Sequence, residues 1–135
     1  MQDGNLHVIF SGIADPAVPV LRVELRRYSG RYELRAGLLN DAAAWIFTPW
    51  LGISDARHYF ELDWRASASP GENNGGLTLW LDGIWRYNRT GVDNDSRRID
   101  RIRLGALAGI DPGTRGIYYL DAFVSRRRSY IGPAP

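Results

Sequence analysis

The sequence predicts an all-β fold built from short antiparallel strands. Apolar and polar residues alternate over 21–26, 33–38, 60–65 and 77–82, and this period of two is typical of strands that bury one face. No stretch of about a dozen residues keeps the helical period of roughly 3.6 without an interrupting glycine or proline. The 15 glycines and 7 prolines separate the strands, as in sandwiches and barrels.

The alternating segments and the turns between them place the strands along the chain. The 135 residues are the length of a single domain, 1–135, with enough core to fold without a disulfide or a metal. The absence of cysteine excludes a disulfide framework and a thiolate zinc site. We expect strands at 6–10, 20–28, 31–39, 45–49, 58–66, 77–82, 84–89, 99–105 and 117–126.

Two hairpins have a register that the sequence predicts. A turn at 29–30 places Glu33 opposite Arg26 and Arg35 opposite Glu24, so that opposite charges meet. A slip of one residue would destroy these matches.

The second hairpin turns at Asp82-Gly83, a dipeptide favoured in type I′ turns. This turn predicts Trp85 opposite Trp80 and Tyr87 opposite Thr78, with the rings together on one face. Leu79 and its neighbours would then face the core.

The charge pattern argues against nucleic acid as a partner. The net charge is +2, and all 17 basic residues are arginine. Most arginines alternate with acids, and the one basic run is Arg126-Arg127-Arg128. A nucleic-acid surface would instead gather basic residues on one face. Insertion into a membrane is not expected either, because apolar runs such as 42–50 fall far short of about 20 residues.

From about residue 58 onward the chain resembles the concanavalin-A-like lectin/glucanase superfamily, in its laminin-G-like bacterial branch. The segments that carry the resemblance are 58–65, 76–83, 90–95, 99–105 and 116–123. The resemblance implies a jelly-roll sandwich of two antiparallel sheets. It also implies a non-catalytic module, glycan-binding or adhesive, of a bacterial surface or secreted protein, and hence an extracellular or cell-surface location.

The chain is shorter at its N-terminus than such modules, and it begins directly before a strand without a signal peptide. We therefore expect either a fragment of a longer protein or a natural short form. Either would leave a strand edge uncovered, and an open edge pairs readily with another chain. The sequence thus predicts a homo-oligomer formed through an exposed edge. It leaves open the alternative that the domain is purely structural or self-assembling, without a small-molecule ligand.

A catalytic interpretation rests on Glu61, Asp63 and Arg65, which share one face of a strand. Laminarinase-type glycosidases of this superfamily carry Glu, Asp and Glu at this spacing. Arg65 stands where the general acid should be, and a guanidinium cannot donate a proton near neutral pH. A degenerate glycosidase is therefore the least favoured function, and we expect no enzyme. His7 and His58 lack triad or metal partners in sequence and are interpreted as structural residues at strand ends.

The sequence predicts a binding face and no cofactor, and it leaves a calcium loop as an alternative. Aromatic rings stack on the apolar faces of sugars, while neighbouring polar groups bind hydroxyls. The candidates for the glycan or partner site are Trp80, Trp85, Tyr87, Tyr59, Glu61, Asp63 and Arg65. Asp93, Asn94 and Asp95 offer oxygen ligands suited to Ca²⁺, although the same residue types also cap turns.

Overall fold

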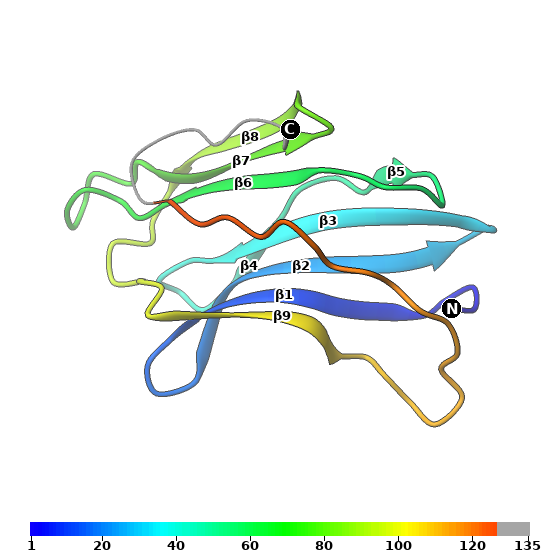
Figure 1. Cartoon of the computed structure of the whole chain (residues 1–135). Coiled ribbons are helices and arrows are strands. Elements are labelled where there is room, and N and C mark those ends of the chain that lie inside the picture. Colours follow the sequence, from blue (N-terminus) through cyan, green and yellow to red (C-terminus); the bar gives the residue numbers. More distant parts are fainter. Residues whose placement is uncertain (127–135) are drawn as a thin grey trace.

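A computed structural model describes residues 1–126. These residues form two antiparallel sheets, and the all-β prediction is therefore confirmed (Figure 1). The six-stranded sheet has the order β4-β3-β2-β1-β9, with β5 also paired to β3, and the three-stranded sheet has the order β6-β7-β8. The strands are β1 (Leu6–Ala14), β2 (Val18–Tyr28), β3 (Arg31–Leu39), β4 (Trp45–Phe47), β5 (Leu51–Ile53), β6 (Phe60–Arg65), β7 (Gly75–Leu81), β8 (Ile84–Val92) and β9 (Arg101–Ala108). Within residues 1–126, no helix is long and apolar enough to cross a membrane.

The β2–β3 hairpin has the predicted register. Arg26 lies opposite Glu33 and Glu24 opposite Arg35, and both pairs form ion pairs, at 2.9 Å and 2.6 Å. The turn residues Ser29 and Gly30 both have positive φ, as a type I′ turn requires.

The core lies between the two sheets. Alternate residues of β2, β3 and β7 point inward, because side chains on a strand alternate between its faces. Leu38 and Leu79 are fully buried at the centre of this layer. The buried residues in contact are Leu21, Val23, Leu34, Ala36, Leu38, Leu51, Leu77, Leu79, Leu81 and Val92.

The expected strand at 117–126 is wrong. The segment runs extended alongside the two sheets (Figure 1), but it pairs with no described strand. Ala122 has a φ of 52°, which interrupts a regular strand. Alternating side chains indicate an extended chain, but a strand also needs a neighbour for its backbone hydrogen bonds. The short β5 was not expected, and it forms where the chain returns along β3.

Candidate binding face of the three-stranded sheet

The three-stranded sheet has one buried and one open face. Leu77, Leu79 and Leu81 of β7 face the core, so the alternate residues Thr78 and Trp80 lie on the opposite side. Their partners across the ladders lie there too. We call this surface the outer face. Its residues are Glu61, Asp63, Arg65, Gly76, Thr78, Trp80, Trp85 and Asn88.

Cross-strand pairing arranges the outer face in rows. Trp80 lies between Glu61 on β6 and Trp85 on β8, which gives an aromatic row with an acid at its end. The Trp85 side chain is 59% exposed, so the ring is accessible. An exposed aromatic ring beside polar groups is a common feature of binding surfaces.

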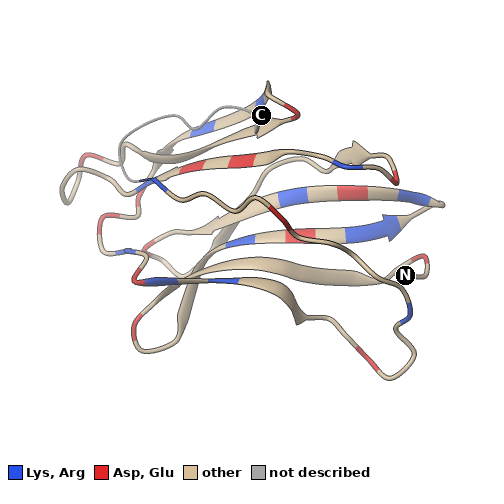
Figure 2. Cartoon of the chain, in the orientation of Figure 1, with Lys and Arg blue, Asp and Glu red and all other residues tan. Residues whose placement is uncertain are grey.

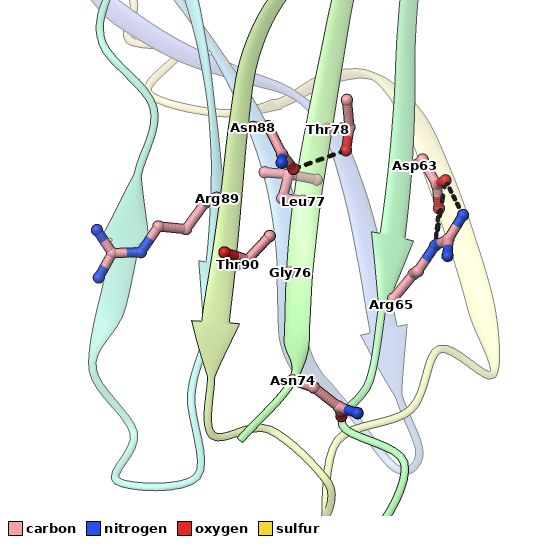
Figure 3. Close-up of a pocket in the computed structure, with 9 residues that line it drawn as sticks. All are labelled: Asp63, Arg65, Asn74, Gly76, Leu77, Thr78, Asn88, Arg89 and Thr90. Carbon is pink, nitrogen blue, oxygen red and sulfur yellow. Dashed lines mark hydrogen bonds and ion pairs between the residues drawn. The ribbon is translucent and has the colours of Figure 1, made fainter. Parts of the chain in front are cut away.

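The next row is polar and borders a shallow groove of about 310 Å³ (Figure 3). Thr78 lies between Asp63 and Asn88, and its hydroxyl donates to Asn88 Oδ1 at 3.0 Å. Arg65 forms an ion pair with Asp63 at 2.8 Å, and this hydrogen bond raises the pKa of Arg65. Together with Arg65 of the neighbouring row, this row presents both a fixed positive charge and oxygen acceptors to a ligand in the groove.

Glycine at position 76 allows β7 and β8 to approach closely beside the groove. A Cβ at Gly76 would collide with the carbonyl oxygen of Arg89 on β8. The close approach of the two backbones therefore requires a residue without a side chain. Figure 3 shows the side chains of Thr78 and Asn88 above this point and Asn74 below it.

The structure brings most of the predicted binding residues together, but Tyr87 is an exception. Tyr87 pairs with Leu79, not with Thr78, and it packs against the core. A register shift between Leu79 and Trp80 causes the difference, because a one-residue bulge moves the following side chain to the other face. Asn88 takes the place on the outer face that Tyr87 was expected to fill.

Tyr59 lies at the edge of this site, one residue before β6. Its N–H donates to Asp82 Oδ1 at 2.9 Å, and its carbonyl accepts the Asp82 N–H at 2.7 Å. Tyr59 therefore anchors the β7–β8 turn to the start of β6, which fixes the aromatic row relative to β6.

His58 stands in a hydrogen-bonded series with Ser54 and Asp82 that the sequence did not reveal. Its Nδ1 lies 2.8 Å from Asp82 Oδ2, and its Nε2 lies 2.9 Å from Ser54 Oγ. The order is that of a Ser–His–Asp triad. The same Nε2 also accepts the backbone N–H of Ser54 at 3.1 Å, so the imidazole fastens the loop after β5 to the turn. The hydrogen bond from His58 lowers the pKa of Asp82.

The predicted calcium residues divide between two roles. Asp93 and Asp95 meet Asp41 from a distant loop, with carboxylate oxygens within 4.8 Å of one another. Desolvation opposes ionisation of Asp41, but hydrogen bonds from Ser96 outweigh it and lower the pKa of Asp41. Desolvation and the Asp41 carboxylate raise the pKa of Asp95. Arg97 lies 3.8 Å from Asp41 and supplies part of the positive charge that a cation would bring.

Asn94, by contrast, points into the protein. It is fully buried, and its Oδ1 accepts the Ser67 N–H at 2.8 Å. Its Nδ2 donates to the carbonyl oxygen of Arg65 at 3.1 Å. These bonds use the side chain as a link between the 93–95 loop and the end of β6.

The opposite surface of the molecule, on the six-stranded sheet, shows why arginine is abundant. Charges of both signs alternate along β2 and β3 (Figure 2). Glu24 is 2% exposed between Arg22 and Arg35. Arg22 stacks over Trp45 at 4.3 Å, and Arg35 lies 3.7 Å from the Phe47 ring centroid. These guanidinium groups form ion pairs with carboxylates and lie over aromatic rings. The basic run that starts at Arg126 continues outside the described residues.

Comparison of the chain with protein-family models, curated proteins and solved structures finds no match. The function is therefore argued from the outer face and from the resemblance in the sequence.

Proposed function

We propose that this chain is a non-catalytic glycan-binding module of a bacterial surface or secreted protein, with a jelly-roll arrangement of its two sheets. The observation that carries the proposal is the pair of rows on the outer face. An accessible indole lies one row away from an ion pair and two hydrogen-bonding side chains. The resemblance to laminin-G-like modules adds support.

The chemistry of a sugar fits this pairing of rows. The C–H face of a pyranose is apolar and lies flat on an indole, so Trp85 supplies the platform. The hydroxyls at the ring edge then reach toward Asp63, Asn88 and Arg65. The carboxylate accepts hydrogen bonds, the guanidinium donates them, and the amide does both. The groove is shallow and open, which suits a segment of a chain better than an enclosed small molecule.

A glycan array tests the proposal, with the wild type beside two variants. We expect Trp85→Ala to weaken binding of the captured glycan by about 2- to 10-fold, since an aromatic contact contributes roughly 0.5–1.5 kcal/mol. Ile84→Ala is the matched control, because Ile84 is 62% exposed on the same strand but is paired with inward-facing Leu81. Equal binding by wild type and Trp85→Ala, or no binding to any glycan, would refute the proposal.

The alternative function is a structural or self-assembling domain. The observation that favours it is the incomplete cover of the six-stranded sheet. An array without hits combined with stable oligomers in solution would select this alternative.

A further inference from the structure

The three-stranded sheet leaves part of the six-stranded sheet uncovered. Ile102 and Leu104 of β9 lie in rows with Gly12 and Phe10 of β1, and Phe10 packs against the core. Cross-strand partners share a face, so both β9 side chains point to the inner side of the sheet. They are nevertheless 37% and 42% exposed. Apolar residues on an inner face indicate that a further layer belongs there.

The free edge of β6 can accept a further strand. The backbone N–H of Asp82 donates to the carbonyl oxygen of Tyr59, so the backbone polar groups of Tyr59 point toward β7. Along an antiparallel strand, these groups point alternately to one side and to the other. The N–H and C=O groups of Phe60, Leu62 and Trp64 therefore point away from β7. β6 is the edge strand on that side, and these groups have no hydrogen-bond partner among the described residues.

Buried polar groups without hydrogen-bond partners lie on the inner sides of both sheets. Trp64 Nε1 and both ring nitrogens of His7 are buried and make no hydrogen bond within the described residues. His7 is paired with Leu25 and so faces inward from β1, and desolvation lowers its pKa. The Tyr118 ring of the same chain lies 6.2 Å from the His7 ring, so the segment after β9 already covers His7. Unsatisfied buried groups are rare in native proteins, so Trp64 Nε1, on the inner side of β6, points to a neighbour that the described residues do not supply.

The total surface supports the same conclusion. The chain exposes 8517 Å², whereas a folded monomer of 15.2 kDa exposes about 7100 Å². The excess is about 1400 Å² per chain, so about 2800 Å² is an upper bound on the area that two copies would bury together, and this bound leaves room for a stable dimer.

The chain itself carries a segment suited to pairing with the edge of β6. Side-chain exposure alternates along 117–120: Ile117 and Tyr119 are 79% and 86% exposed, whereas Tyr118 and Leu120 are 36% and 43% exposed. In Figure 1 this segment runs in the same direction as β6, so pairing within one chain would be parallel. Every ladder in the structure is antiparallel. A second copy, turned by a two-fold axis, can present the segment in the antiparallel direction.

The other two long edges are protected by charge. β8 carries Arg86 and Arg89, and β9 carries Arg101 and Arg103. Like charges on an edge repel a second copy of the same strand. β6 has one basic and two acidic residues, so its charges largely cancel and its edge repels another strand less.

We propose that residues 117–121 of a second copy add to the edge of β6 as an antiparallel strand, and that two copies exchange these segments reciprocally. The added strand satisfies the edge groups of Phe60, Leu62 and Trp64. It also covers the inner face of β9. This inference is independent of glycan binding, because it concerns the edge of the sheet and not its outer face.

The absence of cysteine makes a direct test feasible. One chain carries Asp63→Cys and another carries Tyr119→Cys, and the two are mixed as full-length single-cysteine proteins with a short bis-maleimide. We expect a cross-linked heterodimer, because only contact between chains can join them. Arg86→Cys mixed with Tyr119→Cys is the control, since β8 lies at the opposite edge, and it should give little product. Light scattering of the unmodified wild type at high micromolar concentration should give the mass of a dimer.

Two results would overturn the proposal. The first is a monomer at high micromolar concentration in which only the double variant Asp63→Cys/Tyr119→Cys cross-links, within one chain. The second is equal cross-linking at β6 and β8, which would indicate random encounter.

Discussion

Replacement of Asn94 by alanine should destabilise the fold and loosen the end of β6. The side chain is fully buried and bridges the backbone of Ser67 and Arg65. Asn94→Ala leaves a buried N–H and a partly buried carbonyl without the Asn94 side chain as a partner. Each unsatisfied group costs about 1–3 kcal/mol. Because Ser67 is 6% exposed but Arg65 lies at an exposed strand end, we expect a loss of about 2–4 kcal/mol in the free energy of unfolding.

Urea denaturation followed by tryptophan fluorescence measures this loss. Asn88→Ala is the matched control, because Asn88 is exposed and makes one side-chain bond, to Thr78. Its cost should stay below about 0.5 kcal/mol, as for surface substitutions in general. The reasoning is refuted if both variants lose the same stability. It is also refuted if Asn94→Ala loses stability only when Ca²⁺ is present, because Asn94 would then act as a metal ligand.

Four further results are expected. Gly75→Ala should lose stability, because a Cβ at Gly75 would collide with the Asn94 side chain and with the Val92 carbonyl oxygen. The double variant with Asn94→Ala should lose less than the sum of the two single losses, because only the collision with Val92 remains; additive losses in denaturation would contradict this. Glu24→Gln should cost about 2–3 kcal/mol in the same assay, below the usual 3–5 for a broken buried pair, because its arginine partners remain about a quarter exposed; no change would contradict the burial of this charge. Since the pKa of Asp82 is lowered in the folded state, its contribution to stability is present above the unfolded value of about 3.9 and is lost as the pH falls through the folded value. His58→Ala should therefore unfold at a higher pH in an acid titration, and coincident curves would contradict this. Hydrolysis of p-nitrophenyl acetate that disappears in Ser54→Ala would contradict the absence of catalysis, which we expect.

The sequence was informative where two independent patterns had to agree. In the β2–β3 hairpin, both the charges and the apolar residues required the same register, and the structure has it. In the β7–β8 hairpin, the turn correctly placed Trp85 opposite Trp80. The bulge beside this pair has no sequence signal, so Tyr87 was assigned to the wrong face.

Features that depend on distant segments were not predictable. Asp41 lies beside Asp93 and Asp95 although the sequence separates them widely. No motif near any of these residues indicates that they meet in the fold. The segment 117–121 has the apolar and aromatic residues of a strand, but composition does not say whether a partner with a free edge is available. The series from Ser54 to Asp82 likewise exists only because β5 and the β7–β8 turn meet.

The most direct test of the account is to map where a glycan binds. Backbone amide shifts of the ¹⁵N-labelled wild type should be recorded while a glycan selected on the array is titrated. The account predicts that the shifts concentrate on the outer face, at Thr78, Trp85 and Asn88, and leave the arginine–aromatic surface around Arg22 unchanged. Shifts confined to that surface, or no shifts at saturating glycan, would contradict it.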